Sequence, residues 1–356
     1  MNEIIYHELK KIVSEGWTDG ISLVYGTAGT TNVLNHGKKS GEPIMSVTEN
    51  TIFDLASVTK IFTLFAALRL VDKGILSLDA QIGDYTSAFP NIVSLHLYEL
   101  LNFSRNLVTD KRIDTCSCAA EALEQLYNIS CSNTPGRYSD MGAIVLGRLI
   151  DSLSGITFKG SVCEVFNLCQ LNDTYWWKDL PKEKFSNTQS YDNEYISSGK
   201  EHGIVHTPTG TPHDKKAAIL GVSGHAGLFS TPGDIAKFCI AILSHKIASE
   251  KALKTVCSDR YDYFTVQGQH LGLLCYKKAG IPKISEIPAQ FGDSAFAISG
   301  YTGTYLLIDP DNNQFVSLNA NRVFNRSPHS TKPLSSNIKG TKNYVYRKDS
   351  LLSLIN

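Results

Sequence analysis

The hydrophobic period of this chain changes along its length, and this change constrains the fold more than any other feature. Residues 20–26 and 31–37 are rich in β-branched and aromatic residues and predict two strands. From residue 77 to about residue 258 the apolar positions recur mainly at helical spacing. From Tyr261 the period becomes two, which predicts successive antiparallel strands. We therefore expect an α+β fold whose one antiparallel sheet is built from both ends of the chain.

The two ends of the chain also supply helices that would flank this sheet. The N-terminus is amphipathic, and residues 348–355 predict a short closing helix. We expect a discontinuous sheet domain of residues 1–75 and 260–356, interrupted by a mainly helical domain of residues 76–259. A chain of 356 residues is long enough to bury a core in such an arrangement.

Individual elements can be assigned within these two parts. The irregular segment between Pro181 and Pro212 is rich in Asn, Ser, Gly and Pro and predicts no regular structure. The predicted helices are Ile61–Val71, Ala120–Tyr127, Met141–Ser154 and Pro232–Ser244, and the predicted strands of the C-terminal part are Tyr263–Val266, His270–Tyr276, Ala295–Gly300, Tyr305–Asp309 and Phe315–Asn319.

The charge balance argues against several classes of partner. Lys+Arg and Asp+Glu both total 34, so no net field attracts nucleic acid or an anionic membrane. No apolar stretch has the length of a membrane span or the form of a signal peptide. We expect a cytoplasmic protein with reduced cysteines that acts on a small-molecule or peptide substrate. The oligomeric state stays open.

Ser57 and Lys60 lie where the chain enters the predicted helix 61–71, on one face and one turn apart. A hydroxyl is a poor nucleophile until a neighbouring base takes its proton, and a helix N-terminus stabilises developing negative charge. The pair could therefore carry out covalent catalysis. Because a Ser-x-x-Lys spacing is common on helices, the pair alone does not identify a catalytic site, and other segments of the chain have to support it.

Two further segments could contribute to such a site. Tyr138 and Asp140 directly precede the helix predicted from Met141, so the phenol could point into a cleft. Alternatively, Tyr138 is a half-buried turn residue and Asp140 caps the helix. The second segment is Ala297–Thr304, in which glycines within a strand could admit the backbone of another molecule or mark a bulged edge.

Together, and in this order, the three segments resemble the serine β-lactamase and penicillin-binding-protein superfamily. The closest likeness is to its class C-like branch of β-lactamases, DD-peptidases and esterases. The resemblance runs from Thr51 to about Arg322 and implies a β-lactamase/transpeptidase-like fold. The stretches that carry it outside Tyr138 and Asp140 are Thr51–Lys60, Val71–Asp79, Gly224–Thr231, Ile308–Pro310 and Asn321–Val323.

The resemblance implies a role for each residue of the site. Ser57 would form an acyl-enzyme, Lys60 would accept its proton or keep the network charged, and Tyr138 would relay the proton. Backbone N–H groups of Ser57 and Tyr301 would form an oxyanion hole, and the strand of Ser299 would bind substrate main chain. No metal or other cofactor is implied. The expected site comprises the catalytic residues Ser57, Lys60 and Tyr138 and the substrate or oxyanion residues Asp140, Ser299, Gly300 and Tyr301.

The chain departs from the family pattern in two places. Ile298 stands where relatives carry Lys, His or Arg, and the segment Leu100–Leu107 lacks their usual His and Ser-Gly. A lost charge-assisted hydrogen bond is worth roughly 1.5–3 kcal/mol, or about 10- to 100-fold in affinity. We therefore expect an ester, amide or D-amino-acid peptide as substrate, with weak or no β-lactam turnover. The alternative is a catalytically impaired relative that binds a ligand without turnover.

Remaining candidates have simpler explanations. Arg105 could replace the missing cation. His225, in Gly224–Gly227, could brace the cleft or only hold a turn. His202, His206 and His213 lie without ligand spacing in a polar loop and are expected at the surface rather than on a metal.

Overall fold

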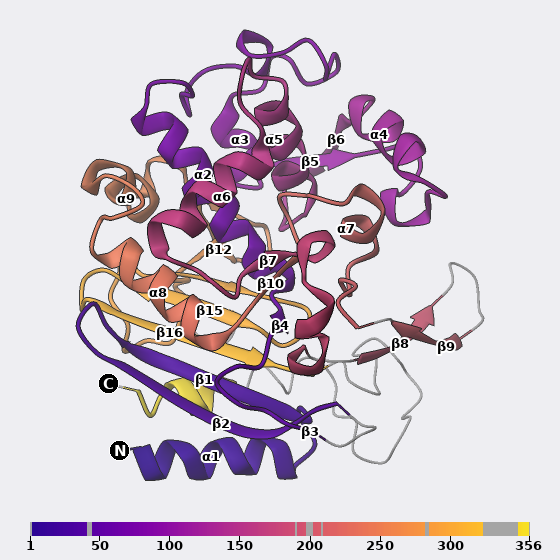
Figure 1. Ribbon diagram of the computed structural model, residues 1–356. Helices are drawn as coiled ribbons and strands as arrows, with labels where there is room; N and C mark the ends of the chain where they lie inside the picture. The colour runs from indigo at the N-terminus through magenta and orange to yellow at the C-terminus, as the bar shows by residue number, and fades with distance from the viewer. Residues whose placement is uncertain are drawn as a thin grey trace.

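The computed structural model of the protein describes residues 2–40, 45–188, 191–196, 202–207, 209–281, 285–322 and 348–355. Within these residues the main sheet has nine strands in the order β11-β12-β13-β14-β15-β16-β1-β2-β3, and all neighbours are antiparallel (Figure 1). Its strands are β1 (Gly20–Thr27), β2 (Thr31–Ser40), β3 (Met45–Ser46), β11 (Tyr263–Phe264), β12 (His270–Leu271), β13 (Tyr276–Lys277), β14 (Phe296–Ser299), β15 (Tyr305–Asp309) and β16 (Gln314–Ala320).

The two faces of this sheet bury different cores. Helix α1 (Asn2–Ser14) and a short helical segment at residues 348–352 cover one face, where Ile5, Leu9 and Leu351 are fully buried (Figure 1). Helices α2 (Thr59–Asp72) and α8 (Pro232–Leu243) lie on the other face. The sheet is therefore covered on both sides, as its continuous buried strands require.

Most of the helical part of the molecule lies above the main sheet in Figure 1. It contains small two- and three-stranded sheets as well as helices. Its further helices are α3 (Leu97–Leu101), α4 (Ala119–Tyr127), α5 (Met141–Asp151), α6 (Phe158–Cys169), α7 (Lys215–Leu220) and α9 (Glu250–Cys257), and the small sheets comprise β4 (Phe53–Asp54), β7 (Tyr175–Trp176) and β10 (Leu228–Ser230); β5 (Arg105–Val108) and β6 (Ser130–Pro135); β8 (Tyr191–Ile196) and β9 (His202–Thr207).

Helix α2 is the buried axis of this part of the protein. Phe62 stacks on Phe238 of α8 with ring centroids 3.8 Å apart, and both side chains are fully buried. The helix ends before Gly74, whose φ of +71° is one that glycine adopts readily. Because α2 is packed on nearly every side, the residues of its first turn are held firmly in place.

The α+β class with an antiparallel sheet is confirmed, and most predicted elements agree with the structure to within a few residues. Thr231 caps α8 through its side chain, and Pro232 occupies the first turn. The division into domains at 75/76 and 259/260 stays a prediction. No helix among the described residues is both long and apolar enough to cross a bilayer.

Two predicted segments were wrong in detail. The single strand predicted over His270–Tyr276 is split into β12 and β13 by a turn in which Leu274 has a φ of +52°. The apolar run there fills the core rather than one face of a strand, so a period of two was misleading. The segment predicted to be irregular holds the 3₁₀ helix Lys182–Asn187 and the β8–β9 hairpin.

Candidate active site

The turn that carries Ser57 is a strained 3₁₀ turn, Ala56–Val58, leading directly into α2. Ala56 has a φ of +46°, in the left-handed region that costs a non-glycine residue about 1–2 kcal/mol. Its N–H donates to Asp54 Oδ1 at 2.9 Å, and Asp54 Oδ2 accepts the N–H of His213 at 2.8 Å. The buried Asp54 carboxylate thus holds the strained turn and ties it to the chain before α7.

Ser57 and Lys60 are in direct contact. Lys60 Nζ lies 3.0 Å from Ser57 Oγ, and the Lys60 side chain is completely buried. Burial favours the neutral amine, but the Asp140 carboxylate outweighs it, so the pKa of Lys60 is raised above its ordinary value. At neutral pH the Lys60 ammonium therefore donates its hydrogen bond to the serine oxygen.

Asp140 occupies the N-cap position of α5, yet its side chain caps nothing. Instead Oδ1 lies 2.7 Å from Lys60 Nζ and Oδ2 lies 3.1 Å from Lys216 Nζ. Burial opposes ionisation, but the two ammonium groups lower the pKa of Asp140 well below its usual value. A cap is worth about 1 kcal/mol, less than the cost of leaving a buried lysine unpaired, and this explains why the carboxylate turns toward the lysines.

Tyr138 lies beside this pair with its phenol in the interior. Its ring centroid is 5.0 Å from Lys60 Nζ, and the ring stacks on Tyr276 at 5.2 Å with Phe103 on another side. The phenol helps to raise the pKa of Lys60, but its buried oxygen makes no hydrogen bond of acceptable geometry within the described part of the chain. An unmet buried hydroxyl costs about 1–3 kcal/mol, so it is ready to accept or donate a bond to an arriving group.

The turn after β14 packs against the 3₁₀ turn that carries Ser57. Thr302 Oγ1 donates to the carbonyl of Asp54 at 2.9 Å, and Thr304 Oγ1 donates to the carbonyl of Leu55 at 3.0 Å. Gly300 permits this approach, because a Cβ there would lie 1.9 Å from Thr304 Oγ1 and 2.9 Å from the Leu55 carbonyl oxygen. Tyr301 follows, with its ring 4.6 Å from that of His213. The predicted segments around Ser57 and Tyr301 are therefore neighbours.

The side chains of Ser299 and Ile298 face opposite sides of β14. Ser299 Oγ donates to Glu286 Oε2 at 2.6 Å, and the same oxygen is 2.6 Å from Lys348 Nζ. Ile298 is fully buried in the core beneath α2. Strand β13 pairs with β14 at Phe296 and Ala297, before these two residues. Ser299 thus has its hydroxyl engaged, and only its main chain is placed to meet a ligand.

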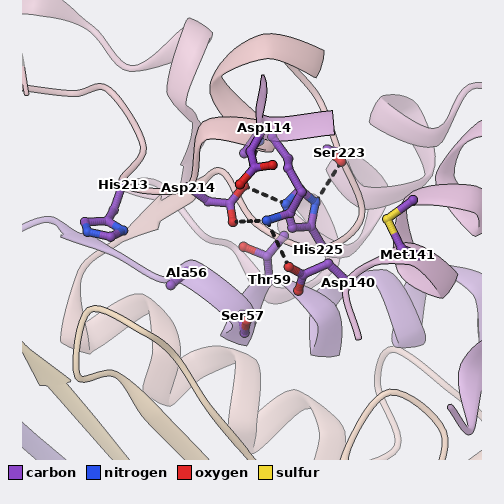
Figure 2. A network of polar contacts seen from close by, with 12 residues as sticks. Ala56, Ser57, Thr59, Asp114, Asp140, Met141, His213, Asp214, Ser223 and His225 are labelled. Atoms are coloured by element: carbon purple, nitrogen blue, oxygen red, sulfur yellow. Dashed lines mark hydrogen bonds and ion pairs between the residues drawn. The ribbon is translucent and has the colours of Figure 1, made fainter. Parts of the chain in front are cut away.

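Sequence reasoning missed Asp214 and Lys216, which form a charged network with Asp140 behind Lys60. Figure 2 shows Asp214, Asp140 and His225 pointing toward one another. Lys216 Nζ lies 2.8 Å from Asp214 Oδ2, and His225 Nε2 lies 2.9 Å from Asp214 Oδ1. His225 Nδ1 is 2.9 Å from Ser223 Oγ. His225 therefore bonds within its own turn through Ser223 and also contacts the carboxylate of Asp214.

Asp140, Asp214 and His225 bring three potential ligand atoms within 4.8 Å of one another, a spacing that a metal ion could use. Both carboxylates are already held by the Lys60 and Lys216 ammonium groups, which supply the positive charge. This donor set fits an ion-pair network better than a metal site.

The departure from the family pattern at Leu100–Leu107 also has a structural consequence. Arg105 lies in β5 and pairs with Glu99 at 2.6 Å. The guanidinium is therefore bound to the carboxylate of Glu99 in α3.

The arrangement defines a class: a serine hydrolase with Ser57 and Lys60 in contact where a 3₁₀ turn enters a buried helix, between a sheet and a helical part. The family model named Beta-lactamase matches residues 8–335, and the chain belongs to that family. It is 27% identical over 322 residues to a candidate D-alanyl-D-alanine carboxypeptidase of Escherichia coli O157:H7, covering 81% of this chain and 72% of the relative.

Other similar proteins differ in their named activity. An N-acetylmuramyl-L-alanine amidase of Bacillus subtilis (strain 168) is 26% identical over 308 residues, covering 76% of this chain and 68% of the amidase. A crystal structure of a class C β-lactamase superposes with a TM-score of 0.74 at 17% identity and covers 99% of this chain and 98% of that one. At this identity the structural likeness supports the fold only.

Proposed function

We propose that this β-lactamase-family hydrolase cleaves an ester or amide, such as a D-amino-acid peptide bond, through an acyl-enzyme on Ser57. The contact between Ser57 Oγ and Lys60 Nζ at 3.0 Å, on a buried helix turn, carries the proposal. The reaction needs a nucleophile, a proton acceptor and donors for the developing oxyanion.

The proton acceptor is assigned from the charge state of Lys60. An ammonium that donates to Ser57 Oγ has no lone pair with which to take the serine proton. Tyr138, whose buried hydroxyl lies beside the pair, therefore takes the proton of Ser57 as it passes its own phenolic proton to the leaving group. In the second half-reaction Tyr138 activates the water that releases the acyl group. Lys60 keeps this network charged.

The oxyanion and the substrate backbone are met by main-chain groups. The N–H groups of Ser57 and Tyr301 stabilise the oxyanion, an interaction worth about 3–4 kcal/mol for each donor. The main chain of β14 at Ser299, beyond the residues that β13 pairs, binds substrate edge-on. Gly300 packs closely against the Leu55 carbonyl. This contact supports the oxyanion hole, because it fixes the distance between the segments of Ser57 and Tyr301.

The substrate class follows from charge at the site and from the relatives. Ile298 supplies no cation for a substrate carboxylate, and Arg105 is engaged by Glu99. Neutral esters and amides should therefore be accepted better than penicillins or cephalosporins. The names of two relatives, a carboxypeptidase for D-alanyl-D-alanine and an amidase, agree with an amide substrate.

A covalent label tests the proposal directly. Wild-type protein treated with a fluorophosphonate should gain the mass of one adduct, located on Ser57 by peptide mapping. Ser57→Ala should gain none and should lose p-nitrophenyl ester hydrolysis by at least about 1,000-fold. Ser77→Ala, at an exposed serine outside the site, is the matched control and should label normally. A wild-type protein that stays unlabelled would instead support the ligand-binding alternative.

A further inference from the structure

We propose that Lys216 is a positioning residue of this hydrolase, which holds the Asp140 carboxylate so that Lys60 remains seated on Ser57. The inference rests on the proposed function of Ser57 and extends it to a residue beyond hydrogen-bonding reach of the reacting atoms. Lys216 contacts Asp140 and Asp214 and belongs to helix α7, far from Ser57 in sequence.

The contacts of Lys216 close a ring. Lys60 Nζ is bonded to Asp140, Asp140 to Lys216, Lys216 to Asp214, and Asp214 to His225. The ring returns to its start because the carbonyl of His225 accepts from Lys60 Nζ at 3.4 Å. Each member therefore has a partner on both sides, so moving one member changes the position of Lys60.

The ring is balanced in charge, and Lys216 is needed for that balance. Lys60 and Lys216 supply two positive charges against the carboxylates of Asp140 and Asp214. Without Lys216, Lys60 would be the one remaining ammonium bonded to Asp140, and Asp214 would retain His225 and the Ala217 N–H but no ammonium partner among the residues that the structure describes. Uncompensated charge in a mostly buried network forces side chains to shift or water to enter. The Lys60–Ser57 contact depends on the same Asp140 carboxylate and should be disturbed.

Charged and titratable groups on neighbouring elements interact with Lys216 less directly than the carboxylates of the ring do. Asp114, in the turn before α4, lies close enough to feel the Lys216 charge, but its carboxylate is held by Arg112 through two contacts at 3.0 and 2.6 Å. On the inner side, Tyr138 faces Lys60 rather than Lys216. Asp140 and Asp214 are thus the two described carboxylates bonded to the Lys216 ammonium.

A cavity gives small molecules access to this position. A hollow of about 240 Å³ is lined by Lys216 together with Met141, Asp114 and Leu107. The Lys216 side chain is 20% exposed, whereas Lys60 is 0% exposed. A small ammonium ion from solution could therefore occupy the space left by a truncated Lys216. The same ion could not readily reach the position of Lys60.

The test is chemical rescue of Lys216→Ala, measured as the rate of fluorophosphonate labelling on Ser57. We expect labelling to fall about 10- to 100-fold, because small displacements of a catalytic group have effects of this size. Ethylammonium should restore it at least fivefold in a saturable manner. Tetramethylammonium at equal ionic strength, too large and without N–H donors, should not. Lys216→Arg should retain most of the rate because it keeps the charge and donors.

Matched variants separate this role from a general effect on folding. Lys215→Ala removes a neighbouring exposed lysine of α7 and should label at the wild-type rate. Lys60→Ala should be slow and not rescued. If Lys216→Ala does not fold, Lys216→Gln provides the same comparison, since it retains a long side chain but no charge, and its labelling should be slow.

The possible failures are distinguishable. Wild-type protein that does not label at Ser57 contradicts the proposed function itself. If wild-type protein labels and Lys216→Ala or Lys216→Gln labels at the same rate, the proposed function stands and the role of Lys216 is wrong. A folded Lys216→Ala that labels slowly and gains nothing from ethylammonium also overturns it, because the lysine then serves only the local structure.

Discussion

Lys60 Nζ and Asp140 Oδ1 are 2.7 Å apart although 80 positions separate the two residues in the chain. The contact joins the first turn of α2 to the start of α5 and fixes the buried ammonium next to Ser57. The protonation of Lys60 and the packing of two helices thus depend on one interaction.

Removing the Asp140 charge should affect both stability and activity. Asp140→Ala leaves Lys60 buried and without its carboxylate, and we expect the free energy of unfolding to fall by about 3–5 kcal/mol. Asp140→Asn keeps a hydrogen-bond acceptor and should cost less. Denaturant unfolding measures both values. Equal stability of wild type and Asp140→Ala would contradict the ion pair.

The same pair predicts how stability depends on pH. Folding lowers the pKa of Asp140, so its contribution is present above the unfolded value near 4 and is lost as the pH falls through the folded value. Folding raises the pKa of Lys60, so its contribution is present below about 10.5 and is lost at pH values above the folded pKa. As the pH falls below about 4, Asp140→Asn should lose less stability than the wild type does. An identical slope in both proteins would count against the assignment.

Gly300 should tolerate no side chain. In Gly300→Ala the new methyl group would collide with Thr304 Oγ1 and press on the Leu55 carbonyl. This would separate β14 from the 3₁₀ turn that carries Ser57. We expect a loss of about 1–3 kcal/mol in stability and roughly 100-fold in ester turnover.

The control for this variant is Gly233→Ala in the first turn of α8. A Cβ at Gly233 would meet no atom within 4 Å, and alanine favours the helix. Steady-state kinetics and thermal unfolding of the two variants should therefore diverge. Similar behaviour would show that the contact of Gly300 with Leu55 has no special importance.

The buried Ile298 predicts substrate preference. The wild-type protein should show a higher kcat/KM with a p-nitrophenyl ester than with nitrocefin, because nothing at position 298 pairs with the cephalosporin carboxylate. Faster nitrocefin turnover would refute this explanation. Ile298→Lys should not by itself give efficient nitrocefin turnover, since a charge inserted into that core should destabilise the protein.

The sequence predicted the relationship of Ser57 and Lys60 because it is local. A spacing of three residues on a helix places both side chains on one face wherever the helix packs. The positions of Tyr138 and Gly300 near them came from the family resemblance, since neither spacing nor period relates segments so distant in the chain.

Lys216 and Asp214 escaped prediction for a physical reason. Their role depends on where a six-residue helix lies, and lysine and aspartate on short polar segments usually face solvent. Asp140 was misleading in the opposite way, because its position before α5 also fits a helix cap. Only the three-dimensional arrangement shows that two ammonium groups compete for that carboxylate.

The left-handed backbone at Ala56 has a consequence for evolution and engineering. Ala56, directly before Ser57, carries backbone strain, and replacing it with glycine should raise the stability of the protein because glycine accepts the same φ without a steric penalty. The gain in stability would come with greater backbone freedom in the turn that carries Ser57. Selection for heat resistance and selection for turnover should therefore favour different residues at this one place.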